Sequence, residues 1–117
     1  MAKQDHLGEF EQLALLAVMR LGDAAYGASI QEELDGTADR SAAISSIYIT
    51  LTRLESKGMV SSSMGEPTED RGGRPRRYFR VERAGVEALR EARERLLSMW
   101  SGLESELEAG YGGAHGG

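Results

Sequence analysis

Four arginines lie within seven consecutive positions of a 117-residue chain whose net charge is −5. They belong to the segment GEPTEDRGGRPRRYFRV, residues 65–81, and are Arg71, Arg74, Arg76 and Arg77. Guanidinium groups bind carboxylates and phosphates through paired hydrogen bonds, so this cluster predicts contact with a polyanion. The alternative is a solvated hairpin tip whose charge serves only solubility, with Glu66, Glu69 or Asp70 pairing with some of the arginines.

The charge of the chain is unevenly distributed. Residues 40–83 carry 9 basic and 5 acidic side chains, whereas residues 1–39 carry 2 and 8 and residues 84–117 carry 3 and 6. Only the middle third is therefore basic. Segregation of this kind indicates a polyanionic partner and says nothing about the fold.

A second group of polar side chains precedes the arginines. In residues 41–60, SAAISSIYITLTRLESKGMV, the apolar residues Ile44, Ile47, Leu51 and Leu54 recur at helical spacing, and Gly58 is a suitable stop. Removing this apolar face leaves six outward positions, which are Ser45, Ser46, Ile49, Thr50, Thr52 and Arg53. Hydroxyl groups bond phosphates or base edges, and arginine can bind guanine bidentately. An exposed isoleucine can contact a thymine methyl group, although lone surface isoleucines are common.

Periodicity predicts the elements that position these two groups. Apolar residues at helical spacing indicate a first helix from Gly8 to near Gly22 and a second that stops near Gly36. After the third helix, the turn formers and the run RRYFRV predict two strands, with Phe79 and Val81 on the core face. Three helices and a basic hairpin predict a mainly α (α+β) winged helix-turn-helix over residues 7–82. In this fold the third helix enters the major groove of DNA.

The longest helical pattern runs from Arg83 to about Leu107, and we expect one dimerisation helix over residues 83–108. Its apolar stripe needs a cover, which a second copy of the chain would supply. The predicted dimer-interface residues are Leu89, Ala92, Leu96, Met99, Trp100, Leu103 and Leu107. Residues 109–117, AGYGGAHGG, contain five glycines and are expected to be disordered.

Several classes of protein are disfavoured by what the sequence lacks. It has no cysteine, its two histidines are His6 and His115, and no glycine-rich phosphate loop is present. We therefore expect no enzyme, no metal site and no cofactor. No apolar run approaches the roughly 18 residues of a membrane span, and the N-terminus does not resemble a signal peptide, so we expect a cytoplasmic protein without a membrane partner.

Three stretches occur together along the chain: LALLAVMRLGDAAYGASIQEEL, ISSIYITLTRLESKGMVSS and RGGRPRRYFRVERAGVEAL. Through them the run from Leu7 to about Leu107 resembles the PadR family of bacterial transcriptional regulators. The resemblance implies a homodimeric repressor that binds a palindromic operator, of the small subgroup with a single C-terminal helix. It also implies that Tyr48 can approach the DNA backbone. The residue pattern alone places Tyr48 at the edge of the core, where a buried ring with a surface hydroxyl is a compatible interpretation.

The same resemblance implies an effector site. Some small members of this family line a pore at the dimer interface with a tryptophan from each subunit, which stacks planar hydrophobic molecules. The matching residue is Trp100, with Leu96 and Met99 beside it. One alternative is a packed interface tryptophan that binds no ligand. An alternative for the whole chain is a winged-helix protein-interaction module whose arginines meet an acidic protein and which binds no specific DNA sequence.

Overall fold

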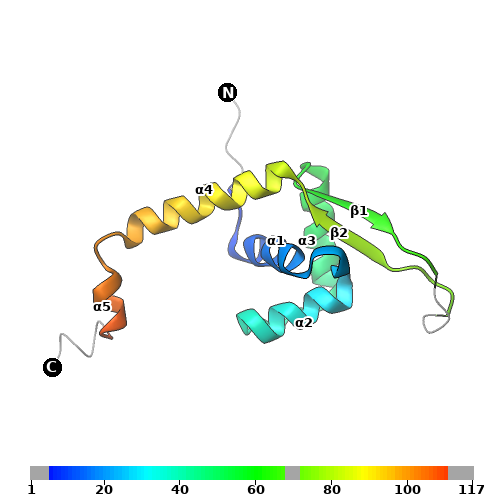
Figure 1. Ribbon diagram of the computed structural model, residues 1–117, viewed down its shortest axis with the longest axis horizontal. Coiled ribbons are helices and arrows are strands. Elements are labelled where there is room, and N and C mark those ends of the chain that lie inside the picture. The colour runs from blue at the N-terminus through cyan, green and yellow to red at the C-terminus, as the bar shows by residue number, and fades with distance from the viewer. Residues whose placement is uncertain (1–5, 68–71, 111–117) are drawn as a thin grey trace.

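The computed structural model describes residues 6–67 and 72–110, and it confirms the mainly helical winged fold (Figure 1). The elements in chain order are α1 (Glu9–Leu21), the 3-10 turn η1 (Gly22–Ala24), α2 (Gly27–Ala38), α3 (Ile44–Ser56), β1 (Val60–Met64), β2 (Arg77–Val81), α4 (Arg83–Trp100) and α5 (Glu104–Glu108). Helices α1, α2 and α3 form the body. The hairpin of β1 and β2 and the helix α4 extend from it to opposite sides.

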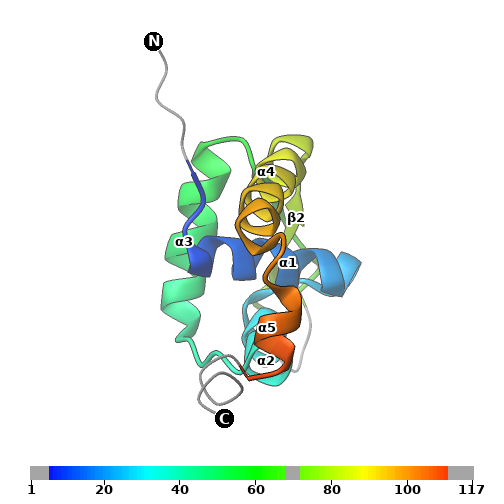
Figure 2. The same ribbon diagram turned by 90° about the vertical axis from the view of Figure 1, so that its left-hand side faces the viewer.

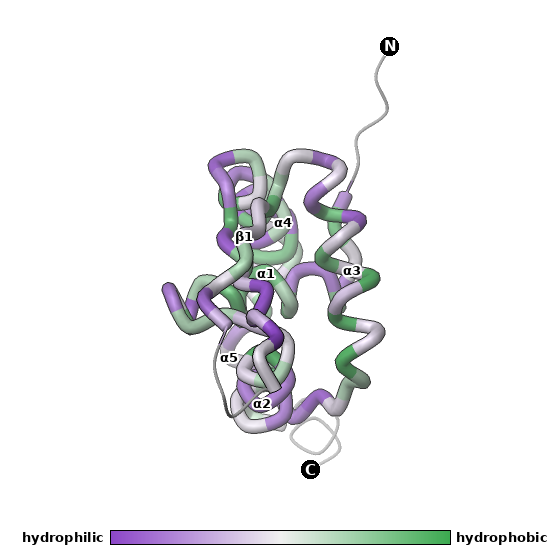
Figure 3. Tube along the Cα trace, turned by 90° about the vertical axis from the view of Figure 1, so that its right-hand side faces the viewer, coloured by the Kyte–Doolittle hydropathy of each residue, from purple (hydrophilic) through white to green (hydrophobic). Residues whose placement is uncertain are grey.

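The core lies between the first three helices. Its largest fully buried side chains come from all three, namely Leu15, Val18, Ile30, Leu34, Ile47, Leu51 and Leu54. Apolar and polar segments follow one another along the tube of α3 (Figure 3), and the apolar residues Ile47, Leu51 and Leu54 are buried. Ile44, predicted to belong to the core face, is 37% exposed. It is the first residue of α3, one turn before the first buried residue of the helix, Ile47.

The ends of the helices follow the predicted signals with one exception. Helix α1 ends before Gly22, whose φ of 60° favours glycine, and α3 ends shortly before Gly58, whose φ is 79°. Helix α2 was expected to stop near Gly36, and this prediction is wrong. The helix continues to Ala38 and ends at Asp39, which adopts the left-handed conformation, and the N–H of the next residue, Arg40, donates to the carbonyl of Leu34 at 3.0 Å.

The hairpin, which we call the wing (residues 60–81), is an antiparallel pair in which Ser62 lies opposite Phe79. Phe79 is buried in the core cluster and Val81 packs against it, as the alternation predicts. The wing is also attached to the start of α2. The N–H of Phe79 donates to the carbonyl of Ala25 at 2.9 Å, and the rings of Tyr26 and Tyr78 stack with centroids 5.6 Å apart.

Helix α4 begins with a close backbone approach. A Cβ atom on Gly85 would lie 2.5 Å from the carbonyl oxygen of Met59 and 2.8 Å from Cγ1 of Val81, so glycine permits the helix to dock on the wing. The prediction of one helix over residues 83–108 is wrong. Helix α4 ends at Trp100, Gly102 turns with a φ of 87°, and α5 leaves at an angle to α4 (Figure 2). We call α4 and α5 together the arm.

Candidate nucleic-acid interface

The N-terminal half of α3 presents a polar surface beside the body. Ser45 and Ser46 are exposed there and Ile49 is 63% exposed, and Thr52, in the C-terminal half of the helix, is also exposed, as the pattern predicts. The residue that precedes the helix is Ala43, which has no side-chain acceptor for the first backbone N–H groups. These N–H groups and the neighbouring hydroxyls can donate to phosphate oxygens or base edges.

Thr50 was predicted to face outward, and the structure contradicts this. Its exposure is only 5%, and it is the one buried polar side chain in the described part of the chain. Thr50 follows Ile47 by three residues and precedes Leu54 by four, so it lies on the same side of the helix as these core residues. Thr50 therefore presents little surface to a DNA duplex.

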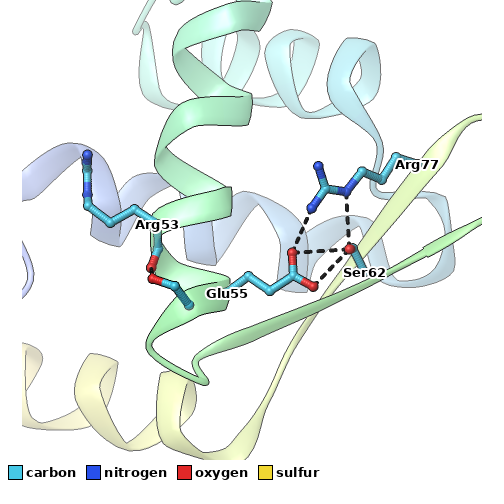
Figure 4. A network of polar contacts seen from close by, with 5 residues as sticks. Arg53, Glu55, Ser62 and Arg77 are labelled. Atoms are coloured by element: carbon cyan, nitrogen blue, oxygen red, sulfur yellow. Dashed lines mark hydrogen bonds and ion pairs between the residues drawn. The ribbon is translucent and has the colours of Figure 1, made fainter.

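Arg53 lies in the last turn of α3, on the side away from the wing (Figure 4). Its Nε is 3.5 Å from Oε2 of Glu11 in α1, and half of its side chain is exposed. In helix-turn-helix proteins the N-terminal residues of the recognition helix contact base edges. The structure therefore places Arg53 between α3 and α1, beyond the N-terminal residues of the helix.

The described arginines of the wing occupy two kinds of position. Arg74 is exposed in the turn after Gly72 and Gly73, whose positive φ values bend the chain. Arg76 is half-buried, with its guanidinium 4.2 Å from the centroid of the Tyr26 ring, and Arg77 contacts Glu55 of α3 at 2.7 Å. Arg77, predicted to contact phosphate, therefore makes an ion pair within the protein. The remaining arginine of the cluster, Arg71, lies outside the described residues.

Tyr48 is a packing residue that joins three elements. Its half-buried ring lies 5.8 Å from the ring of Phe79 on β2. A Cβ atom on Gly27, the first residue of α2, would be 3.1 Å from the Tyr48 hydroxyl oxygen. The tyrosine therefore fixes α3 against both the wing and the start of α2.

Sequence reasoning missed two polar residues just before α3. Arg40 and Ser41 line an open hollow of about 430 Å³ whose other walls include Ser46 and Ile49 of α3. The Arg40 guanidinium is 4.7 Å from the centroid of the Phe10 ring, so α1 holds it near the start of α3. The signal was present in the sequence, because the pair immediately precedes the predicted polar helix.

Comparison with protein families matches a sequence model described as the transcriptional regulator PadR-like family to residues 15–91. The chain belongs to the PadR-like family of transcriptional regulators. This family membership makes the chain a transcription regulator and not an enzyme. A comparison with curated proteins finds no significant match.

Solved structures place this PadR-like regulator among proteins of the same fold. A PadR family transcriptional regulator from Eggerthella lenta is 26% identical, with a TM-score of 0.63 over 86% of this chain and 87% of that one. A PadR-like transcription factor from Bacteroides fragilis is 25% identical, with a TM-score of 0.62 over 85% and 86%. A transcriptional regulator from Clostridium thermocellum shares the fold at 22% identity, with a TM-score of 0.64 over 81% and 89%.

The arm of the PadR-like regulator contains the predicted interface residues, which fall into two groups. Ala92 is buried within the protein, and Leu89 packs against its core cluster. The outer residues are exposed, and they are Leu96, Met99, Trp100, Leu103 and Leu107. The apolar surface open to a partner therefore begins near Leu96, about two turns later than the sequence pattern suggests.

The predicted effector residue Trp100 lies at the bend of the arm. It lines an open hollow of about 310 Å³ together with Leu103, Glu106 and Leu107, all of which follow the bend. Leu96 and Met99, predicted as its ligand-binding neighbours, are not among the lining residues. The break after Trp100 thus changes which side chains surround the indole ring.

The described part of this PadR-like regulator contains neither a group of metal-binding side chains nor a membrane-spanning helix. Across residues 6–67 and 72–110, no three His, Cys, Asp or Glu side chains are grouped so that they could hold a metal ion. Among the described helices, none is long and apolar enough to cross a membrane.

Proposed function

We propose that this chain is a homodimeric repressor that binds a palindromic DNA operator and is released from it by a small hydrophobic effector. The observation that carries this proposal is the exposed polar half of α3 beside a wing with a basic turn, in a chain of a family of transcriptional regulators. The two elements extend from one packed body, so a single duplex can meet both.

In this proposal the start of α3 reads the major groove. Ser45, Ser46 and Thr52 bond base edges or phosphates, and Ile49 contacts a thymine methyl group. The turn of the wing binds the flanking DNA backbone, with Arg74 and Arg71 as phosphate contacts. Arg76 adds positive charge from its position over the Tyr26 ring. The Tyr48 hydroxyl approaches the backbone from the junction of α2, α3 and the wing.

The exposed residues of the arm support the proposed dimer. Leu96, Met99 and Leu103 present apolar side chains to solvent, which a second copy would cover. A twofold dimer would place two α3 helices about 34–36 Å apart, one turn of DNA, and so requires a palindromic site.

The proposed effector is a planar hydrophobic molecule that stacks on Trp100 at the dimer interface. The ring is 37% exposed in the single chain, so a flat ligand and a partner subunit can both reach it. Such a ligand releases DNA only if it binds one arrangement of the two subunits better than the other. Quenching of tryptophan fluorescence that accompanies weaker operator binding would support this role, and quenching without a change in affinity would contradict it.

The test of DNA reading begins with selection of duplexes from a random pool, followed by titrations of variants on the selected site. Ile49→Ala and Ser46→Ala should each relax base preference at one position, at a cost of about 1–3 kcal/mol. Arg74→Ala should weaken binding to all duplex sequences similarly and reduce the slope of log affinity against log salt concentration by about 1. Ser105→Ala in α5 is the matched control and should change neither property.

The alternative, a protein-interaction module without sequence-specific DNA binding, gives a different result in the same experiment. Its arginines could still retain DNA at low salt, because phosphate contacts carry no sequence information. The pool would then show no enriched palindrome, and Ile49→Ala would behave like the control. That outcome would overturn the proposal.

A further inference from the structure

The last turn of α3 is joined to both strands of the wing by a triangle of polar contacts (Figure 4). Oε1 of Glu55 accepts a hydrogen bond from Nη2 of Arg77 at 2.7 Å. Oγ of Ser62 lies 3.0 Å from Oε2 and 3.2 Å from Oε1 of the same carboxylate, and Nε of Arg77 donates to that Oγ at 3.1 Å. We call these three residues the clamp.

The chemistry of the clamp is complementary at each atom. The single proton of the Ser62 hydroxyl is donated to Glu55, while its lone pairs accept from Arg77. The carboxylate and the guanidinium are 33% and 32% exposed, so water screens them less than a pair on the open surface. The Arg77 guanidinium also lies 5.0 Å from the centroid of the Phe79 ring, which directs it toward α3.

The clamp lies near the end of the paired strands that is farther from the buried base of the wing. Val60 and Phe79 are buried at the base of the hairpin, whereas Met64 and Arg77 form its last pair before the turn. A two-stranded hairpin has little stability of its own, so its angle to the body depends on such contacts. The residues of the turn, including Arg74, extend beyond the clamp.

We propose that Glu55 is a positioning residue for DNA recognition. Through Ser62 and Arg77 it fixes the angle between α3 and the wing, so that both elements meet one duplex without further ordering. Glu55 itself makes no contact with DNA in this scheme, and Arg77 serves the clamp instead of a phosphate. The inference rests on the proposed function, because it requires α3 and the wing to bind the same DNA.

Removal of the Glu55 charge should change DNA affinity in opposite directions, depending on whether Glu55 acts by charge or by positioning. A carboxylate near the duplex repels phosphates, so its neutralisation should strengthen binding if charge is its only contribution. Positioning predicts weaker binding to the operator, because the wing loses its fixed angle. The sign of the change therefore distinguishes the two roles.

The first test compares Glu55→Gln with Glu66→Gln, which removes one charge from an exposed position in the wing. Both variants are titrated on the selected operator and on a random duplex at several salt concentrations. We expect Glu55→Gln to lose on the order of tenfold in operator affinity without a loss of affinity for the random duplex, whereas Glu66→Gln, which changes only charge, binds both duplexes at least as tightly as the wild type. Operator binding by Glu55→Gln as tight as the wild type, or tighter, would overturn the inference.

A double-mutant cycle that combines Glu55→Gln with Arg77→Gln tests whether Arg77 acts through its ion pair with Glu55. If Arg77 acts through the clamp, the double variant should lose about as much operator affinity as either single variant, and the salt slope should stay the same. Additive losses with a salt slope lower by about 1 would show that Arg77 is an independent phosphate contact, and the inference would be wrong.

The two proposals fail in different ways. A wild-type protein that prefers no duplex sequence would contradict the proposed function and with it the role of Glu55. A wild-type protein that selects an operator, together with a Glu55→Gln variant that binds it normally, would contradict the role of Glu55 alone. Thermal unfolding of each variant confirms that its domain is folded, since the exchange of a carboxylate for an amide preserves shape.

Discussion

The body with its wing and the C-terminal arm are built in contrasting ways. Residues 7–82 bury a continuous core from three helices and the base of the hairpin, and their polar contacts tie the elements together. The arm, α4 and α5, is anchored through Leu89 and Ala92 and leaves Leu96, Met99 and Leu103 exposed. The first region encloses a core within one chain. The second carries apolar surface that a single chain does not cover.

This contrast separates two tasks of the proposed repressor. DNA reading needs side chains held at fixed positions, and a packed body provides them. Dimerisation needs an apolar surface that another subunit can cover, and the exposed residues of the arm provide this surface. A change that damages one region should therefore spare the other, unless it lies at the joint where α4 meets the wing.

The largest effect is expected from a charge placed on the exposed surface of the arm. Met99 is 76% exposed and lies outside the core cluster, so Met99→Glu should leave the body folded. Burial of the new carboxylate in an apolar interface should weaken self-association by more than about 100-fold. Sedimentation velocity over a concentration series measures the association, and circular dichroism checks the fold.

Ser98→Glu is the matched control for this change. It adds the same charge one position earlier, on the side of α4 that carries Glu91, Glu94 and Arg95. We expect Ser98→Glu to associate like the wild type. Equal association of the Met99→Glu variant would mean that the exposed stripe is not the interface.

A smaller effect is expected at the joint between the two regions. The Cβ of Gly85→Ala would meet the Met59 carbonyl oxygen at 2.5 Å and Val81 Cγ1 at 2.8 Å, so α4 or the wing must shift. We expect a loss of about 1–3 kcal/mol in the free energy of unfolding, measured with urea.

Gly36→Ala is a control that should change the free energy of unfolding in the opposite direction. Apart from its chain neighbours and the backbone of its own helix, no heavy atom of the described residues lies within 4 Å of a Cβ built on Gly36, which is in the last turns of α2. Alanine there should stabilise the protein by about 0.5–1 kcal/mol. If Gly85→Ala proved as stable as Gly36→Ala, the close approach at the joint would be refuted.

The smallest effect concerns pH and lies within the body. Hydrogen bonds from Thr37 and then Arg20 hold the pKa of Glu33 below its usual range. A carboxyl group with a lowered pKa in the folded state stabilises the protein above its unfolded pKa, and this contribution is lost as pH falls through the folded pKa. Stability should therefore decline on acidification below the usual range of a glutamate, and Glu33→Gln should show a shallower decline.

Urea unfolding at a series of acidic pH values measures this difference. Glu32→Gln removes the neighbouring carboxylate, whose side chain is exposed, and should retain the wild-type decline. Curves of equal steepness for Glu33→Gln and the wild type would show that the contacts with Thr37 and Arg20 have no role in acid stability.

Periodicity predicted the parts of the fold that depend on local sequence. The spacing of Ile47, Leu51 and Leu54 located α3 and its buried side, and strand alternation placed Phe79 in the core. These predictions succeed because helix and strand repeats determine which side chains share a face. The exposure of Ser46 and Ile49 followed from the same rule.

Local sequence does not predict contacts between distant parts of the chain. Nothing near Arg53 in the sequence indicates that Glu11 will approach it, and the same holds for Arg77 and Glu55. Thr50 was assigned to the surface because it is polar, although its position in the helix repeat matched the core. In the arm the apolar spacing continues across Gly102, so the pattern alone hid the bend.

The most direct test of a body that reads DNA and an arm that pairs is hydroxyl-radical footprinting on the selected operator. Two copies of α3 should protect two sites centred about 10–10.5 base pairs apart, related by the palindrome. Met99→Glu should lose this paired protection at concentrations that saturate the wild type. A single protected site bound by one wild-type chain would contradict the account.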